Sequence, residues 1–141
     1  MVIYCDTSAL MKLFVTEQHS QTVQKFAAES TRLVVSQITW VEMCSGLGLK
    51  QRTQQVNAAI AATALEQLST EWPRYSKLSV DEDLMKQAGE LALRFGLRAY
   101  DSVQLASAQR AHRQLGLNLL FCCFDRQLNV AAEGLGIPVM P

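Results

Sequence analysis

The sequence predicts an α/β fold in which helices cover both faces of a mainly parallel sheet. Short, continuously apolar runs rich in β-branched and aromatic residues are typical of buried strands. They alternate with longer segments whose apolar residues recur at helical spacing, which favours parallel strands joined by crossover helices. The 141 residues, 49% hydrophobic and 18% charged, are enough for a single domain over residues 1–141 that buries its own core.

The strands are expected where the apolar runs lie, which gives a sheet of four or five strands. The third run alternates polar and apolar residues, and this pattern is also consistent with an edge strand. The other runs are short and almost continuously apolar, as strands buried on both faces are. In order, the expected strands are residues 2–5, 33–35, 75–80, 119–124 and 137–140.

Four helices are expected before the middle of the chain. The first is short and the second is amphipathic. The third is apolar on one side, although Gly46 and Gly48 weaken its second half. The fourth has the alanine-rich centre NAAIAATALEQL. These helices are expected over residues 9–15, 21–29, 39–49 and 54–72.

Each of the three remaining helices is expected to lie between a polar first residue and a glycine. The S-x-x-E pattern of Ser79–Glu82 fits a capping box. An aspartate is expected to start each of the next two helices. The starts and stops are Ser79 and Gly96, Asp101 and Gly116, and Asp125 and Gly136.

The charge balance excludes one class of function. Thirteen Lys and Arg residues face thirteen Asp and Glu residues, so the chain does not hold nucleic acid through bulk positive charge. No apolar run approaches the roughly 20 residues of a membrane helix, and no signal-peptide pattern is visible. The four cysteines form no C-x-x-C pair, so we expect buried reduced thiols in a cytoplasmic protein without a membrane partner.

Four acids are predicted to meet at one edge of the sheet. Asp6 directly follows the first strand, and Asp125 directly follows the strand at residues 119–124. Glu42 lies about one turn into the helix after the second strand. Asp101 opens a helix that must run back across the sheet. Ligands of open parallel sheets bind at the carboxyl ends of the strands, where all four acids are expected.

Crowded carboxylates indicate a cation. Like charges raise one another's pKa, so four acids cannot all ionise without a counter-charge. Oxygen ligands suit a hard ion such as Mg²⁺ or Mn²⁺ better than zinc. Such an ion commonly meets phosphates and lowers the pKa of a bound water. The pattern therefore favours metal-assisted hydrolysis of a phosphodiester.

A structural role is an alternative for each acid. Asp6, Asp101 and Asp125 could each cap the helix that follows. Glu42 lies among apolar neighbours in the run Trp-Val-Glu-Met-Cys. We expect it either on a solvated face or drawn to a charge.

Four motifs together resemble the PIN domain family, and most of all the compact bacterial and archaeal VapC-like toxins. They are DTSAL at residues 6–10, SQITWVE at 36–42, YDSVQLASA at 100–108 and FDRQL at 124–128. The resemblance covers essentially the whole chain, and it is specific because the set occurs in order at these spacings. It implies a three-layer α/β/α sandwich.

The resemblance also implies a Mg²⁺- or Mn²⁺-dependent endoribonuclease that is the toxin of a type II toxin–antitoxin pair. Asp6, Glu42, Asp101 and Asp125 would be its catalytic, metal-binding acids, with Asp6 and Asp101 as direct ligands. Glu42 and Asp125 would ligate directly, act through water or complete a second metal position. Ser8 would hold a metal-bound water or start the helix. RNA would be the substrate, a small antitoxin protein the partner, and a homodimer the expected assembly.

The chain departs from the family at Cys123, where Thr or Ser often stands two positions before the fourth acid. Lys12 and Arg98 could contact RNA or could be ordinary solvated charges. The alternative function is a catalytically silent PIN-like module that binds RNA or a protein. A haloacid-dehalogenase-type phosphatase is disfavoured because it needs an acid two residues after the first one, where this chain has Ser8.

Overall fold

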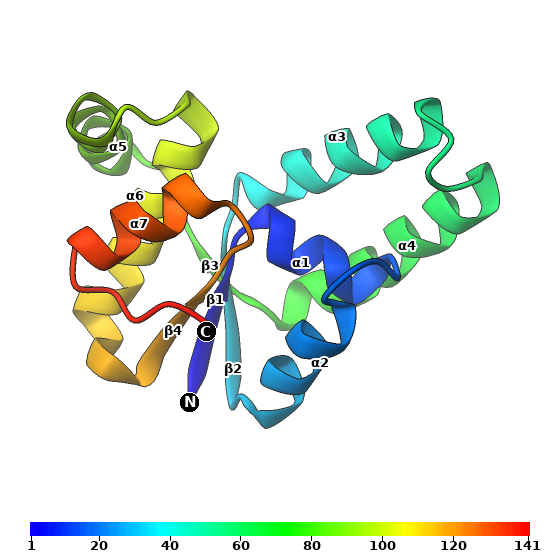
Figure 1. Ribbon diagram of the computed structural model, residues 1–141, viewed down its shortest axis with the longest axis horizontal. Coiled ribbons are helices and arrows are strands. Elements are labelled where there is room, and N and C mark those ends of the chain that lie inside the picture. The colour runs from blue at the N-terminus through cyan, green and yellow to red at the C-terminus, as the bar shows by residue number, and fades with distance from the viewer.

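The computed structural model describes residues 1–141 and has a four-stranded parallel sheet at its centre (Figure 1). The strands are β1 (Val2–Cys5), β2 (Arg32–Ser36), β3 (Ser76–Leu78) and β4 (Leu119–Cys122). Their order across the sheet is β3-β2-β1-β4, and every neighbouring pair is parallel. The two central strands, β1 and β2, are therefore hydrogen-bonded on both sides, and all four strands end at the same edge.

Seven α-helices surround this sheet. They are α1 (Thr7–Phe14), α2 (Ser20–Glu29), α3 (Thr39–Arg52), α4 (Ala58–Glu71), α5 (Glu82–Phe95), α6 (Ala99–Leu115) and α7 (Arg126–Gly134). Two short 3₁₀ helices, η1 (Trp72–Arg74) and η2 (Gly116–Asn118), lead into β3 and β4. None of the helices combines the length and the apolar composition needed to cross a membrane.

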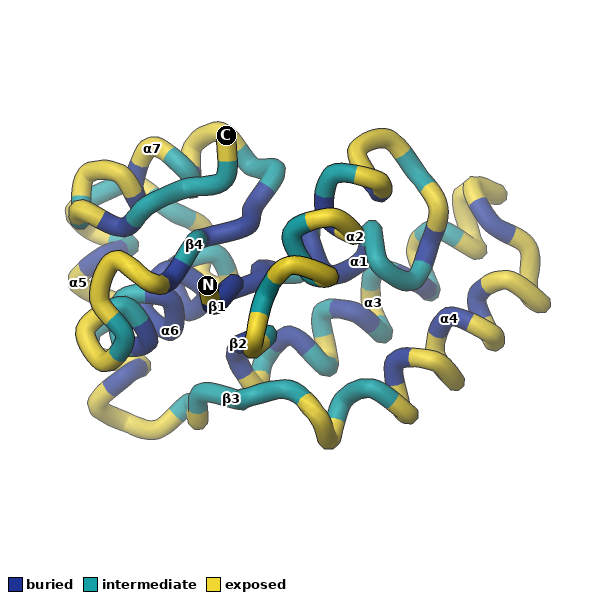
Figure 2. The backbone as a smooth tube through the Cα atoms, turned by 90° about the horizontal axis from the view of Figure 1, so that it is seen from below, coloured by how far each residue is buried: buried dark blue, intermediate teal, exposed yellow.

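The sheet separates two hydrophobic cores, which confirms the three-layer α/β/α architecture. Successive side chains of a strand point to opposite faces. Tyr4 and Val34 therefore pack with α5, α6 and α7, whereas Ile3 and Val35 pack with α1, α3 and α4. Figure 1 shows the two groups of helices on either side of the sheet. Figure 2 shows β1 buried between them.

The third expected strand is confirmed as an edge strand, but the fifth does not form. Residues 137–140 make one isolated parallel bridge, between Phe121 and Val139. The amide of Phe121 donates to Pro138, and the amide of Met140 donates to Phe121. Proline has no N–H of its own to extend this ladder.

The predicted capping box at Ser79 is wrong, because Asp81 caps α5. The Oδ1 atom of Asp81 accepts the N–H of Leu84 at 2.8 Å, and its carboxylate also pairs with Arg110. Ser79 is exposed. The ion pair to α6 gives the aspartate a second partner that the serine lacks.

The sequence suggested that Asp101 starts its helix, but in the structure the helix begins before it. The N-cap of α6 is Arg98, whose backbone is extended, and Asp101 lies in the first turn. Acids are favoured throughout the first helical turn because of the helix dipole. Gly96 and Gly116 end α5 and α6 as expected.

Helix α3 continues through both of its glycines. A Cβ atom at Gly46 would lie 2.8 Å from the terminal methyl of Met11 in α1. The glycine therefore allows α3 to approach α1 closely. This contact fixes the helix that bears Glu42 against the helix that follows Asp6.

Candidate functional site

The four predicted acids all lie at the carboxyl edge of the sheet, which is its upper edge in Figure 1. Asp6 follows β1, and its N–H donates to Cys122 of the neighbouring β4 at 3.1 Å. Asp125 lies three residues beyond the end of β4, at the N-cap of α7. Glu42 and Asp101 lie in the first turns of α3 and α6. The topology thus brings acids from four separate segments to one edge.

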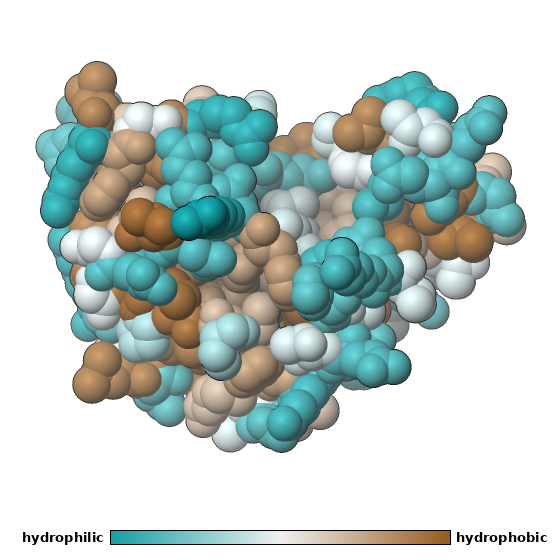
Figure 3. Space-filling model, viewed as in Figure 1, coloured by the Kyte–Doolittle hydropathy of each residue, from teal (hydrophilic) through white to brown (hydrophobic).

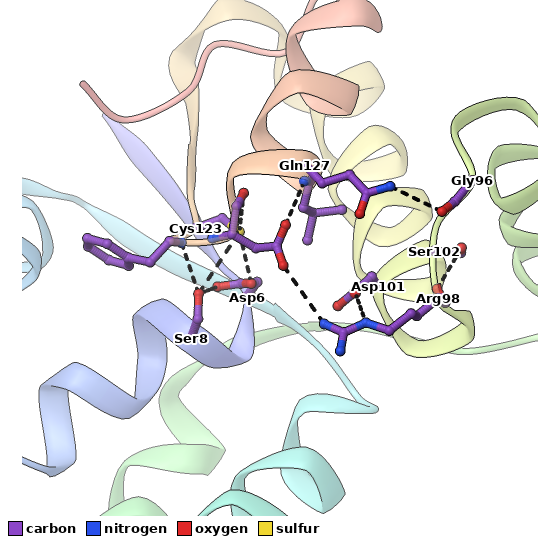
Figure 4. Close-up of polar contacts among 11 residues, drawn as sticks. Asp6, Ser8, Gly96, Arg98, Asp101, Ser102, Cys123 and Gln127 are labelled. Atoms are coloured by element: carbon purple, nitrogen blue, oxygen red, sulfur yellow. Dashed lines mark hydrogen bonds and ion pairs between the residues drawn. The ribbon is translucent and has the colours of Figure 1, made fainter.

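Asp6 is the most buried of these acids, with 5% of its surface exposed. Its Oδ1 accepts the Ser8 hydroxyl at 2.7 Å and the Ala9 N–H at 3.0 Å, so it also caps α1. Its Oδ2 accepts the Cys123 thiol at 3.0 Å (Figure 4). Burial raises the pKa of Asp6 to about 6, and the charge of Glu42 adds to this effect against the hydrogen bonds.

Ser8 and Cys123 connect the segments that follow β1 and β4. The Ser8 hydroxyl donates to Asp6 and accepts the Phe124 N–H at 3.0 Å. The Cys123 sulfur accepts the Asp125 N–H at 3.3 Å while its thiol donates to Asp6. A hydroxyl has a single proton, and that of Ser8 is used by Asp6. Ser8 is therefore placed to orient Asp6.

Glu42 is held by hydrogen-bond donors. Its Oε1 accepts the Thr7 hydroxyl at 2.9 Å and the Gln104 amide at 2.7 Å. The sequence had suggested a solvated face or an opposite charge, and Glu42 is instead half-buried against these neutral groups. Sequence reasoning missed both donors. The available signal was Gln104 itself, a polar residue between Val103 and Leu105 on the most buried helix.

Arg98 lies between the two remaining acids. Its Nε donates to Oδ2 of Asp101 at 3.0 Å, and its Nη2 lies 3.8 Å from Oδ2 of Asp125 (Figure 4). The hydrogen bond and charge of Asp101 raise the pKa of Arg98, and Asp125 and Glu42 contribute. The Arg98 side chain is 82% exposed. It supplies a positive charge at the solvent-facing side of the site.

Lys12 is less available than Arg98. Its Nζ pairs with Glu17 at 3.1 Å and lies 4.7 Å from the centre of the Phe124 ring. Glu17 also pairs with Lys50 at 2.7 Å. The lysine thus lies beside the segment that leads to Asp125, and it shares the single carboxylate of Glu17 with Lys50.

The donor set fits a hard divalent cation in chemistry, since all four acids offer carboxylate oxygens. As the side chains lie, no three carboxylate, imidazole or thiol groups are close enough together to hold one ion. Asp6 is turned toward Cys123 and Ser8, whereas Asp101 and Asp125 are turned toward Arg98. Figure 3 shows a notch in the molecular surface above this edge, between α7 and the arm formed by α3 and α4.

Comparisons with a family model and with known proteins agree on one family. The family model described as PIN domain matches residues 3–133. Ribonuclease VapC46 of Mycobacterium tuberculosis is 30% identical over 138 residues, which cover 98% of this chain and 95% of that protein. Ribonuclease VapC3 of Pyrobaculum aerophilum is 28% identical over 130 residues, covering 91% and 92% of the two chains.

Solved structures share the fold at lower identity. VapC20 of Mycobacterium tuberculosis, described as a sarcin–ricin loop cleaving toxin, aligns with a TM-score of 0.64 and 23% identity over 92% of this chain and 94% of that one. A toxin–antitoxin complex from Klebsiella pneumoniae aligns with a TM-score of 0.65 and 18% identity over 99% of this chain and 96% of that one.

Proposed function

Since this chain belongs to the PIN domain family, we propose that it is an endoribonuclease that cleaves RNA phosphodiester bonds, and that it is the toxin of a type II toxin–antitoxin pair. The observation that carries the proposal is the placement of Asp6, Glu42, Asp101 and Asp125 at one sheet edge. Relatives that match nearly the whole chain are named ribonucleases, which supports RNA as the substrate.

The four acids would hold Mg²⁺ or Mn²⁺, with Asp6 and Asp101 as direct ligands. When bound, such a cation lowers the pKa of a water and neutralises charge on the phosphate. Ser8 and Cys123 orient the Asp6 carboxylate from two sides. Thr7 and Gln104 hold Glu42.

Arg98 would give up its two carboxylates when the cation arrives. Because its side chain is exposed and extends from the start of α6, it can then reach a phosphate of the RNA. Arginine suits this role since its guanidinium matches phosphate geometry. Lys12 would contribute less, because Glu17 already engages it.

The proposal is tested by incubating a panel of structured RNAs with the protein in Mg²⁺, Mn²⁺ or EDTA. Asp6→Asn and Asp101→Asn should abolish cleavage, and EDTA should abolish that of the wild type. Asp83→Asn removes the same charge from an exposed position in α5 and should cleave normally. Cleavage that persists in EDTA or in both site variants would contradict the metal site. Folded wild-type protein that binds RNA without cutting it would instead favour a silent binding module.

A small antitoxin is the proposed partner. The toxin–antitoxin complex from Klebsiella pneumoniae contains a chain with this fold, which supports such an assembly here. A short neighbouring open reading frame should encode a protein that co-purifies with this chain and stops RNA cleavage. A homodimer is proposed as well, and the mass of the purified protein in solution tests it.

A further inference from the structure

The buried glutamine that donates to Glu42 also bonds to two other buried side chains. Gln104 is three residues after Asp101 in α6 and is 1% exposed. Its amide oxygen accepts the Tyr4 hydroxyl at 2.7 Å. Its amide nitrogen donates to Thr39 at 2.8 Å and to Glu42 at 2.7 Å. One side chain thus joins β1, α6 and the first turn of α3.

The direction of these hydrogen bonds is fixed by the chemistry of the partners. A carboxylate can only accept, so the amide NH₂ of Gln104 must face Glu42. The amide oxygen then faces Tyr4, whose hydroxyl can donate or accept and here donates to it. The opposite orientation would set the amide oxygen of Gln104 against the carboxylate. Glu42 therefore determines which end of Gln104 it meets, and the Tyr4 hydroxyl satisfies the other end.

The contact restrains one carboxylate oxygen and leaves the other available. The amide of Gln104 and the hydroxyl of Thr7 both donate to Oε1 of Glu42. Oε2 accepts no hydrogen bond from the protein. A hydrogen bond from a fixed neutral donor keeps a ligating carboxylate oriented without adding charge to the site.

We infer that Gln104 is a positioning residue for Glu42, which holds Oε1 so that Oε2 serves the divalent cation. This inference rests on the proposed metal site and extends it to a residue that need not touch the metal. A buried amide also satisfies Tyr4 and Thr39, so a purely structural role predicts that its loss affects folding only. In the positioning role, replacing Gln104 weakens metal binding only when Glu42 is present. In the purely structural role, the effect of the replacement does not depend on Glu42.

The test is a double-mutant cycle read out as Mn²⁺ affinity by titration calorimetry, without RNA. The variants are Gln104→Met, Glu42→Gln and the double variant, each checked for folding by circular dichroism. Gln104→Met should raise the Mn²⁺ Kd about 10- to 100-fold, as loss of a residue that orients a ligand does. In the Glu42→Gln background the same change should have little further effect. Gln109→Met is the matched control, because Gln109 lies on the same helix and bonds Gln87.

The outcomes separate the two claims. Two outcomes overturn the positioning role alone, provided that the wild type binds Mn²⁺. In the first, Gln104→Met leaves the Mn²⁺ Kd unchanged. In the second, Gln104→Met raises the Kd by the same factor whether Glu42 is present or replaced by Gln. Absence of Mn²⁺ binding by the wild type overturns the proposed metal site and this inference with it. If Gln104→Met does not fold, Tyr4→Phe replaces it in the cycle. Losing that donor should raise the Kd between about twofold and tenfold, again only when Glu42 is present.

Discussion

The Cys123 thiol donates a hydrogen bond to Oδ2 of Asp6 across 3.0 Å. The same sulfur accepts the N–H of Asp125 at 3.3 Å, so one side chain contacts the first acid and the backbone of the fourth. Burial and the nearby charge of Asp6 raise the pKa of the thiol. It therefore stays protonated and remains a donor to the carboxylate at neutral pH.

Substitution of Cys123 should shift the pH dependence of metal binding. Its hydrogen bond lowers the pKa of Asp6 against the effect of burial. Cys123→Ala removes that donor and should move the midpoint of Mn²⁺ binding upward by up to about one pH unit. Cys123→Ser keeps a donor at the position and should stay close to the wild type. Mn²⁺ affinity measured from pH 5 to pH 8 checks both, and identical profiles for Ala and Cys would contradict the assigned role.

Asp6→Asn should stabilise the metal-free protein at high pH. Burial raises the pKa of Asp6 from its ordinary value of 3.8 to about 6, so the folded state binds this proton more tightly than the unfolded state. The charged carboxylate therefore costs the wild type stability above pH 6, and the cost disappears as the pH falls from 6 to below 4. A shift of about two units corresponds to about 3 kcal/mol at most.

Urea unfolding in EDTA from pH 4 to pH 8 measures this effect. The free energy of unfolding of Asp6→Asn should exceed that of the wild type by about 1–3 kcal/mol at pH 8. The difference should shrink toward pH 4, where the wild-type carboxyl is protonated. A difference that does not change with pH, or a variant less stable at pH 8, would show that the charge of Asp6 is not the cause.

The sequence predicted the parts of the fold that depend on local pattern. The apolar runs mark the strands, and the acid that follows a strand becomes an N-cap at Asp6 and Asp125. The partners of the acids were not predictable. Gln104 is 62 residues from Glu42 in sequence, and no local rule indicates that an amide in one helix meets a carboxylate in another.

The N-cap of α5 likewise could not be predicted from the local sequence, because it depends on a contact with another helix. Ser79 and Asp81 both stand before the helix, and the capping box favours Ser79 by sequence alone. The structure selects Asp81, because Arg110 of the neighbouring α6 pairs with it at 3.0 Å. Asp81→Ala should therefore lower the Tm by several degrees, whereas Ser79→Ala should leave it unchanged. Thermal melts followed by circular dichroism compare the two, and a larger loss for Ser79→Ala would mean that the cap lies there.

Arg98 should compete with the divalent cation for the acidic site. Its guanidinium bonds Asp101 at 3.0 Å and lies 3.8 Å from Asp125, so a cation that takes these carboxylates must displace it. Because the side chain is exposed, the competition is weak and screened by salt. Arg98→Gln should therefore tighten Mn²⁺ binding only about twofold to fivefold at low ionic strength, and less in high salt.

The matched control for this prediction is Arg94→Gln, which removes the same charge from an exposed position on α5, where Arg94 lies over Phe95. If the competition is local, Arg94→Gln leaves the Mn²⁺ Kd unchanged while Arg98→Gln lowers it. A general effect of net charge would lower the Kd equally in both variants. Weaker Mn²⁺ binding in Arg98→Gln would mean that the arginine helps to assemble the acids before the cation arrives, since its loss would then leave Asp101 and Asp125 to repel each other.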